Sequence, residues 1–174
     1  MNLREEYLKE LQDEATAKYE IFVDMDGVLC NFDERFEYFF DMPIERYRER
    51  FGNQAAYNKI SDMGKIFWSA MKWQPGGKEL WSHVSKYNPS LLTSPGYFTG
   101  AEEGKKEWSQ DHLSPQPAGI YFRQAEDKSE LSGANKILID DRADTIQQWI
   151  AKGGIGILHV NTPQTLEILS KYYL

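Results

Sequence analysis

Five short apolar segments, separated by stretches with helical periodicity, limit the folds that are open to this chain of 174 residues. Each segment is rich in aliphatic, β-branched or aromatic residues, which are typical of a buried strand. The predicted strands cover 19–23, 90–93, 119–122, 136–140 and 155–160. Strands that alternate with helices form a parallel sheet with helices on both faces. We therefore expect an α/β fold built on a five-stranded parallel sheet.

Apolar residues at helical spacing predict helices between these strands and at both ends of the chain. The first predicted helix covers 2–18, and we expect its apolar face to pack against the residues that follow. That face comprises Leu3, Tyr7, Leu8 and Leu11. Further helices are predicted at 80–87, 102–113, 146–150 and 162–174. Residues 33–75 carry no strand signal, so we expect a helical cap there, inserted into a core formed by 1–32 and 76–174.

Polar residues directly follow three of the predicted strands. They are Asp24 and Asp26, then Thr93 and Ser94, then Asp140, Asp141 and Arg142. The carboxyl ends of parallel strands meet at one edge of the sheet, where ligands bind in folds of this type. Gly27 allows the turn that two carboxylates one residue apart need in order to face one site. Converging carboxylates repel one another unless a cation compensates them, and an all-oxygen set without Cys or His favours Mg²⁺ over Zn²⁺.

These residues resemble the four motifs of the haloacid dehalogenase superfamily of phosphohydrolases, in the same order and at the same strand ends. The matching residues are Asp24-Met25-Asp26-Gly27-Val28-Leu29, Thr93-Ser94, Lys128 and Asp140-Asp141. Within the superfamily the chain is most similar to the 5'(3')-deoxyribonucleotidase group. That similarity comes from Phe32 after the first motif, Leu-Thr-Ser-Pro at 92–95 and Ile-Asp-Asp-Arg at 139–142. The resemblance implies a Rossmannoid core with a small helical cap after the first strand.

The resemblance also implies a role for each site residue. Asp24 would be the nucleophile that forms an aspartyl phosphate, and Asp26 would be the general acid and base. Thr93 and Lys128 would hold the phosphoryl oxygens. Mg²⁺ would be held by Asp24, the main-chain carbonyl of Asp26 and Asp140, with Asp141 in support. The candidate substrate-binding residues are Ser94, Phe32, Trp68, Lys105 (with Lys106 as its alternative) and Arg142; Phe67 and Trp73 are further candidates for stacking.

Each feature also has a purely structural interpretation. Ser94 can be the N-cap of a following helix, and Asp140 and Asp141 can cap the helix that begins after them. Lys128 lies in a run of charged residues that is typical of a solvated loop. The aromatic residues of the insertion can form a core of its own, which we expect for Phe36, Phe39, Phe40 and Tyr47.

The function implied is that of a Mg²⁺-dependent phosphatase with a phosphomonoester substrate, a 5'-nucleotidase acting on (deoxy)nucleoside monophosphates. Glu126 stands where that group is expected to carry a basic residue. A first alternative is therefore a phosphatase of the same mechanism that acts on a sugar phosphate or on the 3'-phosphate end of a polynucleotide. A second alternative is a catalytically silent binding module, whose signature would be the loss of Asp24 or Asp26.

Charge and cysteine content narrow the partners that we expect. Lys and Arg total 20 against 27 Asp and Glu, a net charge of −7, which disfavours strong polynucleotide binding. Cys30 is the single cysteine, so the chain cannot form an internal disulfide. No apolar run is long enough to cross a bilayer, and the first residues lack an apolar signal core. We expect a cytoplasmic monomer or homodimer that binds no membrane.

Overall fold

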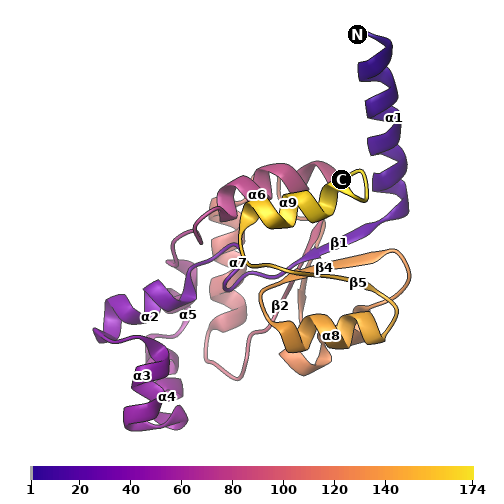
Figure 1. Ribbon diagram of the computed structural model, residues 1–174. Helices are drawn as coiled ribbons and strands as arrows, with labels where there is room; N and C mark the ends of the chain where they lie inside the picture. The colour runs from indigo at the N-terminus through magenta and orange to yellow at the C-terminus, as the bar shows by residue number, and fades with distance from the viewer. Residues whose placement is uncertain (1) are drawn as a thin grey trace.

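The computed structural model describes residues 2–174. Residue 1, which the sequence analysis assigns to the core, lies outside the described residues. Its centre is one sheet of five parallel strands in the order β3-β2-β1-β4-β5 (Figure 1). The strands are β1 (Glu20–Val23), β2 (Ser90–Thr93), β3 (Ile120–Phe122), β4 (Lys136–Asp140) and β5 (Ile155–Leu158). The predicted five-stranded parallel sheet is thereby confirmed.

Strand β1 lies in the middle of the sheet because it pairs with β2 on one side and with β4 on the other. Val23, its last residue, pairs with Leu91 and with Ile139. Alternate residues of β1 point to opposite faces, so Ile21 and Val23 belong to one buried cluster and Phe22 to another. The loops that follow β1, β2 and β4 therefore begin side by side.

Helices cover both faces of this sheet. They are α6 (Gly77–Val84), α7 (Ala101–His112), α8 (Ala143–Ala151) and α9 (Thr162–Ser170), with the 3₁₀ helices η1 (Ser85–Tyr87) and η2 (Ala125–Leu131). Figure 1 shows α6 and α9 together on one side of the sheet and α8 on the other. On the α8 side, Trp149 packs edge to face on Phe22 with the ring centroids 5.6 Å apart. Both faces of the sheet are thus buried, as the apolar strands require.

Four helices lie between β1 and α6, in the region where the sequence predicts a helical insertion. They are α2 (Phe32–Phe40), α3 (Ile44–Phe51), α4 (Asn53–Met63) and α5 (Lys65–Ser69). Phe36, Phe40 and Tyr47 pack together inside this group, with Phe36 fully buried. Phe39 is an exception to the predicted core, because 40% of it is exposed. Helix α5 packs closely on α7 at Gly104, where an added Cβ would lie 2.6 Å from that of Trp68.

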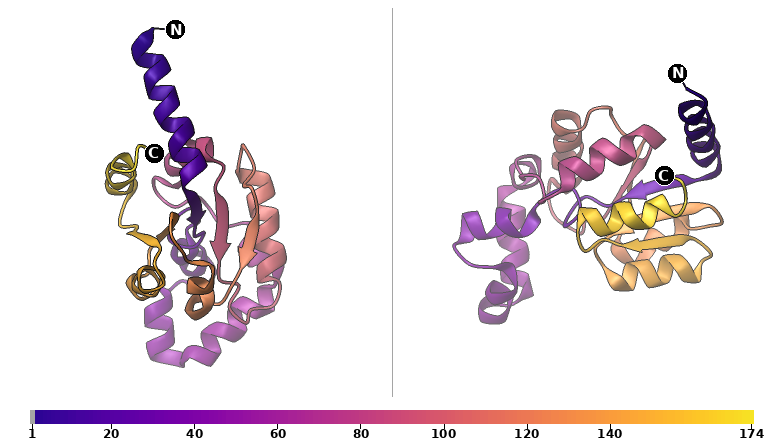
Figure 2. Two further views of the ribbon diagram at one scale, coloured as in Figure 1. Left: turned by 90° about the vertical axis from the view of Figure 1, so that its right-hand side faces the viewer. Right: turned by 45° about the horizontal axis from the view of Figure 1, so that its top comes forward.

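The first helix does not pack as the sequence predicts. Helix α1 (Leu3–Lys18) extends away from the sheet, and Ala15 is its only buried residue (Figures 1 and 2). Leu3 is 86% exposed and Tyr7 is 60% exposed. The capping box of Asn2 and Glu5 stabilises the helix locally, with both hydrogen bonds 3.0 Å long. The expectation that the apolar face of this helix docks on the core is therefore wrong.

Most predicted boundaries agree with the structure within two residues, but three helix ends differ more: α6 begins at Gly77, α8 begins at Ala143 and α9 ends at Ser170. The last strand ends at Leu158, because the chain turns towards Asn161, whose side chain caps α9. Helix α9 ends at Ser170 rather than at Leu174, since Tyr173 has a left-handed backbone (φ 62°). Among the described residues, no helix has both the length and the apolar character needed to span a membrane.

Candidate active site

The chain turns sharply after β1, and this turn brings Asp24 and Asp26 to the same edge of the sheet. Asp24 continues the strand by donating its N–H to the carbonyl of Ile139, at 2.9 Å. The carbonyl of Met25 then accepts hydrogen bonds from three successive N–H groups, those of Val28, Leu29 and Cys30. Gly27 has φ +77°, a conformation that side chains disfavour. The turn at this position therefore uses the conformational freedom of glycine, as the sequence predicts.

Three carboxylates converge where β1 and β4 end. One oxygen each from Asp24, Asp140 and Asp141 lies within 4.8 Å of the other two. Burial and the neighbouring charge of Asp24 raise the pKa of Asp140 to about 6 and that of Asp141 to about 7. Asp140 also accepts a 2.9 Å hydrogen bond from the main-chain N–H of Arg142. The cluster thus concentrates negative charge at a single point.

Lys128 bridges two members of this cluster. Its Nζ lies 2.9 Å from Oδ1 of Asp24 and 2.8 Å from Oδ2 of Asp140. Burial alone would lower the pKa of Lys128, but the charges of Asp24 and Asp140 outweigh it and the pKa is raised. The charged run around Lys128 is not a solvated loop, because it forms η2 and leaves the lysine 2% exposed.

The donor set fits a hard divalent cation. It consists of carboxylate oxygens without a Cys or His, the chemistry that Mg²⁺ prefers. One lysine cannot balance three carboxylates, and the excess negative charge adds to burial in raising the pKa of Asp140 and Asp141. Gly27 has no side chain where Asp141 lies, which lets that carboxylate come close to the turn after β1.

A second lysine is held beside Asp26. Lys105 on α7 is fully buried, and its Nζ lies 2.6 Å from Oδ2 of Asp26, 2.9 Å from Oγ1 of Thr93 and 2.6 Å from the carbonyl oxygen of Ser94. It also lies over the ring of Trp68, 4.9 Å from the centroid. Burial raises the pKa of Asp26, an effect that Lys105 opposes and Asp24 reinforces. Lys106, the neighbouring candidate, is exposed and lies over Phe122 instead.

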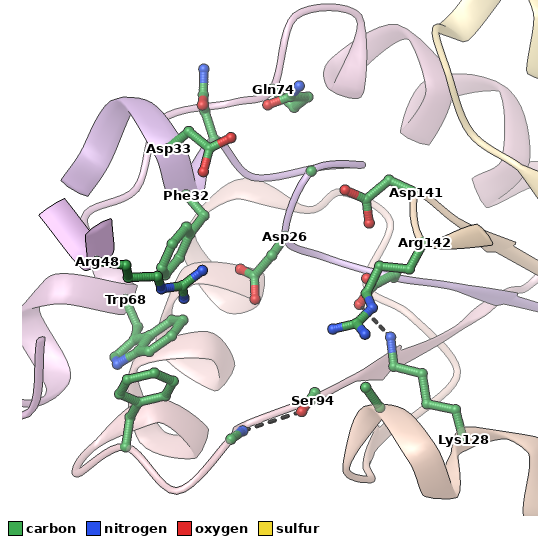
Figure 3. A pocket seen from close by; sticks show the side chains of 16 residues that line it. Asp26, Phe32, Asp33, Arg48, Trp68, Gln74, Ser94, Lys128, Asp141 and Arg142 are labelled. Carbon is green, nitrogen blue, oxygen red and sulfur yellow. Dashed lines mark hydrogen bonds and ion pairs between the residues drawn. The ribbon is translucent and has the colours of Figure 1, made fainter. Parts of the chain in front are cut away.

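A cavity of about 270 Å³ opens over these residues (Figure 3). Its lining contains eight of the predicted site residues: Asp24, Asp26, Phe32, Trp68, Ser94, Lys128, Asp141 and Arg142. Three other predicted residues, Thr93, Lys105 and Asp140, are fully buried and touch the lining residues rather than the cavity. The structure therefore brings together in space residues that lie up to 118 positions apart in the sequence, from Asp24 to Arg142.

Ser94, Asp140 and Asp141 do not cap helices, which was the structural alternative to their predicted roles in the site. Ser94 does not cap α7, whose N-cap is Gly100; its hydroxyl donates to Gln124 and accepts from the N–H of Gly96. Arg142, rather than Asp140 or Asp141, is the N-cap residue of α8, and its guanidinium pairs with Asp144 at 2.7 Å. Neither acid is therefore used to cap that helix.

Aromatic rings form one wall of the cavity. The ring of Phe32 lies 5.5 Å from that of Phe67 and 5.7 Å from that of Trp68, and Phe98 lies 5.4 Å from Trp68 on the other side. Phe67 and Trp68 are buried, whereas Phe32 is half-buried and lines the cavity. Trp73 is not part of this wall in the described structure, because it packs on Trp108 with the centroids 5.0 Å apart.

Sequence reasoning missed several residues that line the cavity. They are Asn31, Asp33, Arg48, Gln74, Gly96, Phe98 and Ala125. Arg48 comes from α3, and Figure 3 shows its guanidinium directed over the aromatic wall towards Asp26. Within residues 2–174 it forms no ion pair. No local signal distinguishes Arg48 from Arg46 and Arg50 on the same helix.

Comparison with known proteins gives likeness in fold. No protein-family model matches the chain, and no curated protein sequence does. Among solved structures, a hydrolase from Streptococcus pneumoniae TIGR4 matches with a TM-score of 0.54 and 12% identity, over 88% of this chain and 99% of the other. A phosphonoacetaldehyde hydrolase-like protein from Oleispira antarctica matches with a TM-score of 0.49 and 12% identity, over 88% and 82%. The five-stranded parallel sheet, its two covered faces and the likeness to the Streptococcus hydrolase show that this chain has the α/β fold that the sequence predicts.

Proposed function

We propose that this chain is a phosphatase of the haloacid dehalogenase superfamily that hydrolyses a phosphomonoester through an aspartyl phosphate. One observation carries the proposal: Asp24, at the end of the central strand, lies against Lys128 and the carboxylates of Asp140 and Asp141, at the bottom of a cavity. Asp26 lines the same cavity two residues later. A nucleophile, a proton donor and a cationic partner are therefore available to one substrate.

Each side chain has a defined task in the proposed reaction. A carboxylate oxygen of Asp24 attacks phosphorus, and Asp26 gives a proton to the oxygen of the leaving group. Asp26 then takes a proton from the water that hydrolyses the aspartyl phosphate. Lys128 offsets the negative charge that gathers on Asp24 and the phosphoryl oxygens. Thr93 keeps its own O–H proton, because Lys105 supplies the proton in the bond that they share, but its hydroxyl lies behind the cavity lining and reaches a phosphoryl oxygen only when that lining shifts.

The same cluster would hold the metal ion. Asp24, Asp140 and the main-chain carbonyl of Asp26 would bind Mg²⁺, with Asp141 in support. Bound there, Mg²⁺ would supply the positive charge that lets a carboxylate approach an anionic phosphate.

We propose a nucleoside monophosphate as the substrate, and residues 33–75 as a cap over the site. Phe32 and Phe98 offer aromatic faces beside the carboxylates, with the buried ring of Trp68 packed between them, and such faces stack nucleobases. Arg48 adds a cation on the same side of the cavity, which suits an anionic substrate. These residues come from the inserted helices or from the loop after β2. The part of the substrate that is distant from its phosphate would therefore be recognised by residues outside the catalytic cluster.

A substrate panel tests the proposal. The purified protein is incubated with Mg²⁺ and with nucleoside monophosphates, sugar phosphates and an oligonucleotide that carries a 3'-phosphate, and released phosphate is measured. We expect turnover that is highest on a nucleoside monophosphate and that the Asp24→Asn variant lacks, which excludes a contaminating phosphatase. A preference for sugar phosphates or for the oligonucleotide would overturn the substrate assignment alone. Absence of turnover on the whole panel would contradict the phosphatase assignment and favour a binding module.

A further inference from the structure

We propose that Lys105 is a positioning residue that orients the carboxyl group of Asp26, and that it does not bind the substrate. This inference rests on the proposed function, because it concerns the step in which Asp26 donates a proton. Lys105 lies on α7, which is not one of the strand-end loops that carry the other catalytic groups. The geometry of its ammonium group assigns the role.

The hydrogen bonds of Lys105 leave no donor for a phosphate. A lysine ammonium has three N–H groups and no acceptor. The three acceptors within 3 Å of Nζ are Oδ2 of Asp26, Oγ1 of Thr93 and the carbonyl oxygen of Ser94. A phosphate contact would therefore require the loss of one of these bonds. Lys128, by contrast, lines the cavity and pairs only with the two carboxylates of Asp24 and Asp140.

The bond to Asp26 also determines which of its oxygens carries the proton. Because Lys105 can only donate, Oδ2 of Asp26 must accept, and a proton on this carboxyl group is directed to Oδ1. Oδ1 is enclosed by the protein and makes no hydrogen bond to any residue of the described chain. An enclosed oxygen without a partner is an exception that needs an explanation. In the proposed reaction its partner is the leaving-group oxygen, which reaches Oδ1 only when the side chains that cover this atom shift.

Lys105 is itself held in place by the packing around α7. Its side chain is fully buried, and the ring of Trp68 on α5 covers the ammonium. Helices α5 and α7 approach closely at Gly104, where a Cβ would come within 2.6 Å of the Cβ of Trp68. A rigid donor of this kind keeps the carboxyl group in one orientation before the substrate arrives, which is the condition for efficient proton transfer.

Two substrates that differ in leaving group separate this role from others. A nitrophenolate leaves phosphorus without a proton, whereas the alkoxide of a nucleoside 5'-monophosphate needs one. We expect Lys105→Met to lower kcat/KM for the nucleoside monophosphate by about 100-fold or more and for p-nitrophenyl phosphate by less than about tenfold. The ratio kcat/KM is chosen because it reports the steps up to departure of the leaving group. Lys106→Met, on the exposed neighbouring residue, is the matched control and should change neither value.

A double-mutant cycle gives the second readout. If Lys105 acts through Asp26, then adding Lys105→Met to Asp26→Asn should lower kcat/KM for the nucleoside monophosphate by less than about threefold more. Losses that multiply would overturn the proposal, because they would show a contribution independent of Asp26. Should circular dichroism show that Lys105→Met is unfolded, the same two comparisons are made with Lys105→Gln, which keeps two N–H donors.

The outcomes separate this proposal from the one on which it rests. A wild-type protein that hydrolyses both substrates, with equal losses on both in the Lys105 variant, overturns the positioning role and leaves the phosphatase assignment intact. A wild-type protein that hydrolyses neither of these substrates nor any other phosphate ester of the substrate panel overturns both. A selective loss on the nucleoside monophosphate together with a non-additive cycle supports the positioning role.

Discussion

Gly27 and Asp141 are in such close contact that a methyl group on Gly27 would come within 2.7 Å of the carboxyl carbon of Asp141. Gly27 also has φ +77°, so Gly27→Ala would introduce both backbone strain of about 1–2 kcal/mol and a clash. We expect a lower melting temperature and at least a tenfold loss of phosphatase activity, because Asp141 is displaced from the carboxylate cluster. The measurements are a thermal scan and kcat/KM for the preferred substrate.

Gly153→Ala is the control for this variant. Gly153 has φ +89° and nothing within 4 Å of an added Cβ, so the substitution brings the strain without the clash. We expect a similar cost in backbone strain and unchanged activity. Equal losses of activity in the two variants would mean that the contact with Asp141 has no catalytic consequence.

Asp24→Asn should remove activity while leaving the fold intact. An amide has nearly the shape of the carboxylate, but it is a poor nucleophile, and we expect kcat to fall by several orders of magnitude. Circular dichroism checks the fold, and a beryllofluoride adduct should form on the wild-type protein alone. Asp111→Asn, on an exposed aspartate at the end of α7, is the control and should keep full activity. Near-normal turnover of a folded Asp24→Asn protein would exclude the proposed nucleophile.

The carboxylate cluster predicts how stability depends on pH and on Mg²⁺. In the folded protein, burial and neighbouring charge raise the pKa of Asp140 to about 6 and that of Asp141 to about 7, well above the ordinary value for an aspartate. The folded state therefore holds these protons more tightly than the unfolded state. The contribution of both groups to the free energy of unfolding thus falls as the pH rises from roughly 4 to 7. In the proposed metal site, Mg²⁺ would bind the deprotonated carboxylates and would stabilise the folded state by mass action.

We therefore expect Mg²⁺ to raise the melting temperature more at pH 8 than at pH 5, relative to EDTA. Asp141→Asn should make the EDTA melting temperature less sensitive to pH between these values, because one of the raised pKa values is removed. Asp111→Asn should behave as the wild type does. A Mg²⁺ effect of equal size at both pH values would contradict the assignment of the cluster as the metal site, as would full activity in EDTA.

Phe32 tests whether the aromatic wall contacts a base. Phe32→Ala should raise KM for a nucleoside monophosphate by about 5- to 150-fold, the equivalent of a stacking contact of roughly 1–3 kcal/mol, with little change in kcat. A small phosphate ester without a base should respond far less. Phe39→Ala, on the exposed side of the same helix, is the control. Equal losses on both substrates would identify Phe32 as packing for Phe67 and Trp68 and would favour a sugar phosphate.

Arg48 tests the charge on the insertion side of the cavity. Because its guanidinium is directed into the cavity, Arg48→Met should raise KM for every anionic substrate, by about 3- to 10-fold. Arg46→Met removes the same charge from the same helix at a position outside the cavity lining. A comparable rise in KM in both variants would show that overall charge, rather than a contact in the cavity, is responsible.

The ends of these strands could be predicted from two local signals, an apolar run and the polar residue that ends it. Ser90–Thr93 and Lys136–Asp140 match the predicted bounds, since each is an apolar run that stops at a polar residue. The position of Lys105 also had a signal in the sequence. It lies four residues after Ala101 and three before Trp108, on the face of α7 that is buried. Helical periodicity alone therefore favoured Lys105 over Lys106.

Other features depend on contacts that no local pattern specifies. The apolar spacing of α1 predicts docking, but Arg4, Glu14 and Lys18 fall on the same helical face as Tyr7 and Leu11, and burying them would require charged partners. The role of Arg48 depends on how the four inserted helices sit over the strand ends. That arrangement is set by tertiary packing such as the contact of α5 with α7, which joins segments about 40 residues apart.

The central place of β1 has a consequence for how the molecule opens. Amide protons of α1 can exchange with solvent when the helix frays, because Ala15 is its one buried residue. Those of β1 are bonded to strands on both sides, and they become accessible only when the whole sheet separates. Between Lys18 and Glu20 the chain thus passes from a weakly anchored helix to the strand at the centre of the sheet. Asp24, the proposed nucleophile, follows this strand directly and is bonded to Ile139 of β4, so we expect fraying of the first helix to leave its position unchanged.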